Sequence, residues 1–167
     1  MMENAREFEY DYEVVNNRIK PIADRLVSKN SELCHIKTDM VLFIVNHKSK
    51  GSRDRVILAR TSRISPKWRE LLFQFGTNSY SHCIEFFGKT TVCFDMNQMI
   101  ALVYRELLLI DHDGGIRHPD TNDWWRIIVG LGRHWFYPDS SCPNLLDEDV
   151  DWERLLGEEI EKARPLS

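Results

Sequence analysis

The segment at residues 95–110 constrains the fold of this chain more than any other part of its sequence. It reads DMNQMIALVYRELLLI, and no glycine or proline interrupts it. Asp95 is a preferred N-cap residue, and the turn sequence DHDGG follows at residues 111–115. A cap, a long run of helix-forming residues and a glycine turn predict a helix that begins after Asp95 and ends before Asp111.

Shorter patterns predict the other elements. Apolar or alternating runs predict strands at residues 40–46, 55–64, 80–87 and 90–94, with a turn at Gly88 and Lys89. Helical spacing and capping residues predict helices at residues 14–28, 66–75, 124–136 and 150–163. Pro21 predicts a kink or a division in the first helix, because proline lacks an amide donor. The order of elements predicts an α+β fold, with helices packed on a small antiparallel or mixed β-sheet and further helices at the C-terminus.

The predicted strand at residues 80–87 places His82, Ile84 and Phe86 on one face. A lone histidine among apolar residues is typical of a core position with satisfied ring nitrogens, so we expect His82 to be structural. Cys83 lies on the opposite face, which excludes a base and nucleophile pair with His82.

The length of 167 residues fits a single domain, which we expect to span residues 1–167. The four cysteines show no CxxC spacing and no secretory signal precedes them, which predicts free thiols and a cytoplasmic protein. Charged residues interrupt the apolar runs far short of the roughly 20 residues that a membrane span needs, so no membrane role is expected.

Two motifs carry a resemblance to a known family. The predicted helix contains RELLL at residues 105–109, and GGIRHPDTNDWW follows at residues 114–125. With the strands before them, these segments resemble the phage metallopeptidase family, a zincin-like group, over roughly residues 40–130. In that family a helix carries His-Glu-x-x-His, and a glycine-containing turn and a histidine-aspartate segment follow. The resemblance implies a zincin-like core at about residues 40–135.

The chemistry of the family motif depends on two histidines. Four residues apart on one helical face, they bind zinc, and the glutamate between them activates the bound water. By resemblance, Arg105 and Leu109 stand at the histidine positions. Glu106 stands at the general-base position and His118 in the region of the third ligand. Neither a guanidinium nor a leucine can bind the metal. We therefore expect no cofactor, and an ion pair of Arg105 with Glu106 and Asp120 in place of zinc.

A second metal site stays open in the loop after the helix. His112, Asp113, His118 and Asp120 lie within nine residues and offer donors that zinc accepts. The same segment also predicts a simple turn, since glycine tolerates positive φ, and a cap on the next helix from Asp120 or Asn122. We favour the turn and the cap.

Candidate partner-binding residues lie in two places. Trp124 and Trp125 are adjacent on a predicted helix, so at least one ring must lie near the surface. The second place is a basic run at residues 47–55, which lies across a predicted turn and includes Lys48, Lys50 and Arg53. A solvated loop is the first interpretation of that run, and a contact with an acidic partner the second. The acidic helix predicted at residues 150–163 is interpreted as a solvated face.

Three functions compete. The favoured hypothesis is a catalytically inactive, zincin-like phage or prophage protein that binds a host protein. One role that we expect for such a protein is inhibition of a component of bacterial defence. The alternative is an active metal-dependent hydrolase or peptidase with zinc held by non-standard ligands. A nucleic-acid-binding module is the second alternative. It is not favoured, because a net charge of −4 gives no general attraction to phosphate.

Overall fold

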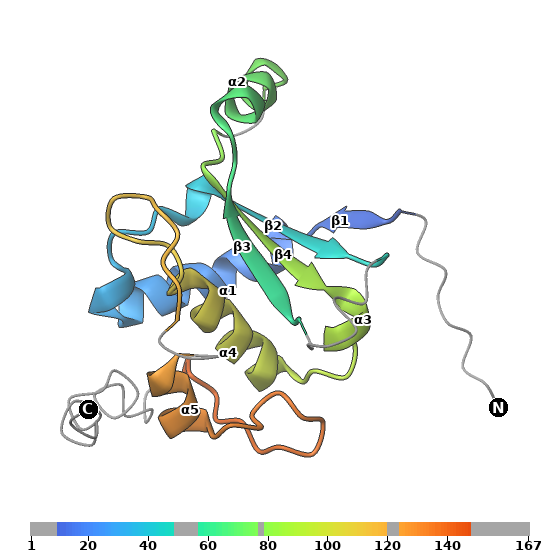
Figure 1. Cartoon of the computed structure of the whole chain (residues 1–167), viewed down its shortest axis with the longest axis vertical. Helices are drawn as coiled ribbons and strands as arrows, with labels where there is room; N and C mark the ends of the chain where they lie inside the picture. Colours follow the sequence, from blue (N-terminus) through green and yellow to red (C-terminus); the bar gives the residue numbers. More distant parts are fainter. Residues whose placement is uncertain (1–9, 49–56, 77–78, 120–123, 148–167) are drawn as a thin grey trace.

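The computed structural model describes residues 10–48, 57–76, 79–119 and 124–147, and its centre is a four-stranded sheet (Figure 1). The strands are β1 (Tyr12–Val14), β2 (Val41–Asn46), β3 (Ala59–Arg63) and β4 (His82–Phe87), in the order β1-β2-β4-β3. The central pair, β2 and β4, is parallel, and both outer pairs are antiparallel. The sheet is therefore mixed, and the α+β prediction is confirmed.

Two helices cover one face of the sheet. Helix α1 (Asn16–Lys29) contacts β2, and helix α4 (Met96–Leu107) contacts β3 and α1. The strands send alternate side chains toward these helices, and those side chains are buried: Phe43, Ala59, Ile84 and Phe86. Their neighbours on the opposite face, including Leu42 and Cys83, are only partly buried. The core thus lies on one side of the sheet, as the alternation around His82 predicts.

Helix α4 begins where the sequence predicts. The Asp95 side chain accepts a hydrogen bond from the amide of Gln98, and the Gln98 side chain accepts one from the amide of Asp95. This reciprocal pair is a capping box, which satisfies two amides at the start of the helix. The helix ends at Leu107, slightly earlier than the predicted Ile110.

Several predicted boundaries need correction. Residues 90–94 do not form a strand, because α3 (Gly88–Thr91) is a single helical turn in which the hydroxyls of Thr90 and Thr91 donate to the carbonyl of Phe87. Strand β1 was not predicted, since only three residues form it. Helix α1 continues through Pro21 without division. Helix α5 (Trp125–Leu131) ends at Gly132, which has a positive φ, and the predicted helix at residues 150–163 lies outside the described residues.

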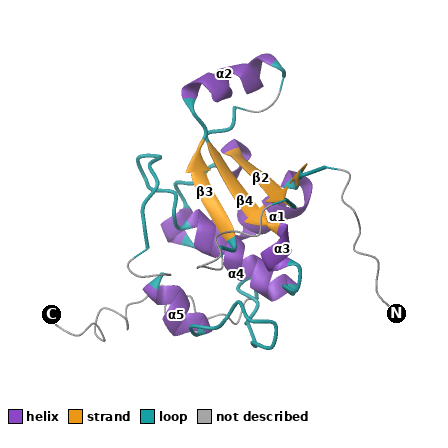
Figure 2. Cartoon of the chain, turned by 45° about the vertical axis from the view of Figure 1, so that its right-hand side comes forward, coloured by secondary structure: helices purple, strands orange, loops and turns teal. Residues whose placement is uncertain are grey.

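Helix α2 (Pro66–Gln74) lies apart from these layers. It links β3 to the segment before β4 and stands beyond the end of the sheet (Figure 2). Pro66 occupies its first turn, as predicted. Backbone amides in the first turn of a helix have no hydrogen-bond partner within the helix, so the lack of an amide hydrogen in proline costs nothing there. None of its residues is buried. Two short 3₁₀ turns, Ser31–Leu33 and Thr38–Met40, complete the path from α1 to β2. In the described part of the chain, no helix combines the length and the apolar character that crossing a membrane requires.

Candidate functional site: a buried arginine–glutamate pair

The last turn of α4 carries Arg105 and Glu106 to the underside of β3. Glu106 is fully buried, and its Oε1 accepts a hydrogen bond from Nη1 of Arg105 at 2.5 Å. Its Oε2 accepts a hydrogen bond from the hydroxyl of Thr61 at 2.8 Å. The side chain of Arg105 is 19% exposed, so it lies mostly within the protein rather than in solvent. The predicted ion pair between Arg105 and Glu106 is present, whereas Asp120 lies outside the described residues.

This arrangement limits the chemistry of Glu106. A general base needs a water molecule within hydrogen-bond reach of a carboxylate oxygen. In this structure one oxygen is bound by a cation, the other by a hydroxyl, and the side chain has almost no contact with solvent. The pair neutralises a carboxylate that would be costly to bury alone. Glu106 is therefore placed to stabilise the α4–β3 contact.

A tryptophan covers the same turn. Nε1 of Trp124 donates a hydrogen bond to the backbone carbonyl of Arg105 at 3.2 Å, and the guanidinium carbon of Arg117 lies 5.1 Å from the centre of the Trp124 ring. Trp124 is 7% exposed, so its ring offers little surface to a partner, and its role in partner binding stays a prediction. The side chain of Trp125 lies outside the described part of the structure. Sequence reasoning missed the contacts of Thr61 and Trp124 with α4, because each joins segments far apart in the chain.

Leu109 lies two residues beyond the end of α4. Its amide donates to the carbonyl of Glu106 at 3.1 Å, a bond that tightens the last turn. Its side chain packs against the hydrophobic core. The side chain of Leu109 therefore contributes an apolar contact and has no atom that could bind a metal ion.

The following loop is a turn, as favoured from the sequence. The amide of Gly114 donates to the carbonyl of Asp111, and Gly114 has a φ of 76°, which explains the need for glycine. The amide of Gly115 donates to Oδ1 of Asp113 at 2.7 Å, so this carboxylate supports the turn. The side chains of His112 and His118 are exposed.

Two other histidines fasten this turn to the body of the protein. Nε2 of His82 donates to the carbonyl of Gly114 at 3.0 Å, and Nδ1 lies 2.8 Å from the hydroxyl of Ser81. Burial is the largest cause that lowers the pKa of His82, and the nearby guanidinium groups of Arg63 and Arg69 lower it further. The ring of His35 lies 4.0 Å from the ring of His112, and Nε2 of His35 contacts the carbonyl of Ile110 at 2.9 Å. His82 is structural, as predicted.

The other candidate residues are dispersed. Nζ of Lys48 pairs with Asp11 at 3.1 Å, and Lys50 and Arg53 lie outside the described residues. All four cysteines are free thiols, as predicted. Burial, and to a smaller extent the neighbouring carboxylate of Glu85, raises the pKa of Cys83 to about 11. A thiol with so high a pKa is protonated at neutral pH and is a poor nucleophile.

The residues at the ligand positions that the resemblance implies do not fit a zinc ion. Zinc takes imidazole, thiolate or carboxylate donors, usually four in a tetrahedral site. Arg105 and Leu109 have no such atom, and the carboxylate of Glu106 is held by Arg105 and Thr61. Among the described residues, no three His, Cys, Asp or Glu side chains lie together so that they could hold a metal ion. Asp120, the fourth member of the predicted loop site, is not among them.

Comparison with known proteins identifies a family for this chain. No curated protein and no solved structure matches it. The family described as "putative phage metallopeptidase" matches residues 11–158, which include every described strand and helix and the Arg105–Glu106 pair. The match covers most of the chain, so the resemblance seen in RELLL and its flanking segments reflects membership: this protein belongs to the phage metallopeptidase family.

Proposed function

We propose that this chain is a phage protein that has lost the peptidase chemistry of its family and acts by binding a host protein. The observation that supports this proposal is the burial of the Glu106 carboxylate, together with its bonds to neighbouring side chains. Its carboxylate is bound by Arg105 and Thr61 and is shielded from solvent. A binding function needs no metal, no activated water and no access to this carboxylate.

The exchange of residues at the ligand positions supports the same proposal. Restoring a metal site would require two new donors, at positions 105 and 109, and the release of Glu106 from its ion pair. The proposed role also includes inhibition of host defence, because phage proteins that bind host components without altering them can act by blocking those components. The cytoplasm of the bacterial host is the proposed place of action.

Capture from host lysate tests the proposal. The full-length chain, tagged and purified, is incubated with lysate of a bacterial host, and retained proteins are identified by mass spectrometry. The proposal expects one host protein to be retained uncut, and equally well with and without a zinc chelator. Repeated recovery of the chain alone, or zinc-dependent cleavage of the retained protein, would contradict it.

A further inference from the structure

Helix α2 exposes an unusual amount of aromatic surface. Trp68 is 60% exposed, Phe73 is 66% exposed and Phe75, directly after the helix, is 83% exposed. Three large aromatic side chains within eight residues are thus mostly exposed, and exposed apolar surface of this extent on a soluble protein can mark a contact site. Because α2 buries none of its own residues, the core does not account for its apolar side chains.

A groove lies between α2 and the uncovered face of the sheet. We call it the α2 groove, with a volume of about 500 Å³, and its lining includes Leu42, Ile64, Trp68, Leu72, Cys83 and Arg63. Leu42 and Cys83 come from the central parallel strands, on the face opposite α1 and α4. Parallel strands are normally covered on both faces, so this apolar lining is a natural place for another chain to pack. The volume is in the range of pockets that accept side chains or small ligands.

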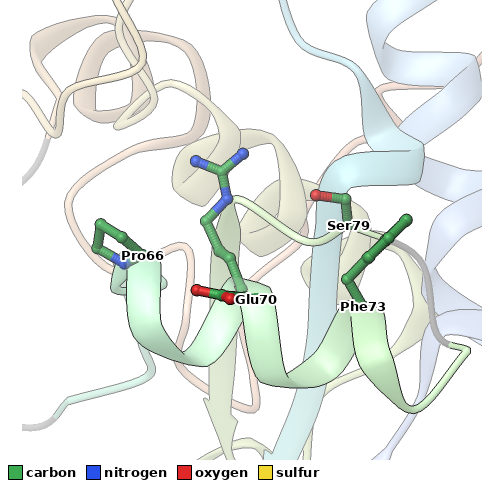
Figure 3. A pocket seen from close by; sticks show the side chains of 5 residues that line it. Pro66, Glu70, Phe73 and Ser79 are labelled. Atoms are coloured by element: carbon green, nitrogen blue, oxygen red, sulfur yellow. The ribbon is translucent and has the colours of Figure 1, made fainter.

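A second hollow, of about 390 Å³, lies on another side of α2. Figure 3 shows Pro66, Glu70 and Phe73 along the helix, with Ser79 bordering the hollow from the segment that leads into β4. Arg69 also lines this hollow. The helix is therefore flanked by two depressions, and Phe73 borders one of them while Trp68 borders the other.

Each depression has one arginine in its lining, Arg63 in the α2 groove and Arg69 in the second hollow. Lys67 precedes Trp68 in α2, and none of these three cations forms an ion pair with a carboxylate of the described residues. Nε of Arg69 is buried and has no hydrogen-bond partner in the described part of the chain, so this guanidinium has unused hydrogen-bonding capacity there. On α2 itself, Glu70 is the one carboxylate. An overall acidic protein thus carries three cations against one carboxylate on α2 and in the linings of its two depressions.

We infer that the α2 groove is the partner-binding surface of this protein, and that its partner is an acidic, amphipathic segment of another protein. Apolar side chains of that segment would fill the groove against Trp68 and Leu72, and its carboxylates would meet Arg63, Lys67 and Arg69. The aliphatic lining favours a protein over a nucleic acid, because leucine, isoleucine and cysteine side chains neither stack on bases nor neutralise phosphates. The inference rests on the proposed binding function and names its surface.

Fluorescence anisotropy with a designed probe tests the inference. The probe is a labelled peptide of about 16 residues, with leucine and tryptophan at i, i+3, i+4 and i+7 and glutamate elsewhere, and its twin carries lysine in place of glutamate. We expect the full chain to bind the acidic peptide and not the basic twin. Trp68→Ala and the double variant Arg63→Glu, Lys67→Glu should each weaken binding about ten-fold or more. Met96→Ala, which removes a side chain of similar exposure on α4, should have no effect.

Four outcomes would overturn the inference, and the first three concern the peptide. They are equal binding of both peptides, unchanged binding by the Trp68 variant, and displacement of the acidic peptide by single-stranded poly-dT. A dimer of the unliganded chain that Trp68→Ala dissociates would also overturn it, because a second copy would then occupy the groove. Zinc-dependent cleavage in the lysate experiment would remove the proposed function and leave peptide binding at α2 intact, so the two failures can be told apart.

Discussion

The charged side chains at the end of α4 are largely buried and paired, whereas those at α2 lie beside exposed aromatic residues. At the end of α4, Arg105 and Glu106 pair with each other beneath β3, and the site is closed. At α2, Arg63 and Lys67 have no carboxylate partner among the described residues, and the surrounding aromatic side chains are exposed. The contrast agrees with the proposed function, in which Arg105 and Glu106 stabilise the fold and α2 provides the partner-binding surface.

The largest expected effect is on the closed region. Arg105→Ala removes the cation from a buried carboxylate, and we expect the free energy of unfolding to fall by about 3 kcal/mol. Urea denaturation of the full chain measures it. The double variant Arg105→Met, Glu106→Leu should be more stable than the single variant, because it leaves no unpaired charge. A single variant as stable as wild type would show that the pair does not stabilise the fold.

A smaller loss is expected from the hydroxyl that completes this site. Thr61→Val keeps the shape of the side chain and removes the hydrogen bond to Oε2 of Glu106. We expect a loss of about 2 kcal/mol, since a hydrogen bond to a charged group is among the stronger ones. Ser62→Ala, at an exposed neighbouring position in β3, serves as the control and should change little. Equal effects of the two substitutions would contradict a special role for Thr61.

The pH dependence of stability should report His82. Its pKa is lowered in the folded protein, mainly by burial, from the ordinary value of 6.5. Below pH 6.5 the unfolded chain takes up a proton that folded His82 resists. The stabilising contribution is therefore complete above pH 6.5 and declines as the pH falls toward the folded pKa. Denaturation series at several pH values should show this decline, and His82→Gln should flatten it. An identical decline in the variant would assign it to other groups.

The smallest expected effect on stability belongs to the open region. Trp68→Ala should change the free energy of unfolding by less than about 0.5 kcal/mol, because Trp68 is mostly exposed and α2 has no buried residue. Thermal denaturation monitored by circular dichroism would measure this. A loss as large as that of Arg105→Ala would mean that α2 is part of the folding core, and the contrast between the two regions would fail.

The sequence predicts the elements whose pattern is strong and local. Strands β2 and β4, helix α2 and the capped start of α4 follow from apolar runs, Pro66 and Asp95. The predicted strand at residues 90–94 is wrong because its β-favouring residues lack a neighbouring strand, and threonine hydroxyls stabilise a helical turn instead. The β-propensity of a segment does not reveal whether a neighbouring strand is available to pair with it.

The candidate site could be predicted only in part. The adjacent pair of Arg105 and Glu106 is visible in the motif, because the family pattern assigns both positions. The contacts of Thr61 and Trp124 depend on how β3 and the loop before α5 pack on α4, and no spacing in the chain encodes them. The exposure of Trp68 could not be predicted from the sequence either, because the apolar residues of a helix normally face the core.

Metal analysis of the full chain tests the central claim most directly. The protein is purified without chelator, supplied with zinc, freed of excess metal and measured by mass spectrometry of the elements, beside the variant His118→Ala. We expect far less than one zinc per chain in both proteins. One zinc bound per wild-type chain and lost in the variant would contradict it, because a metal would then be held despite Arg105 and Leu109.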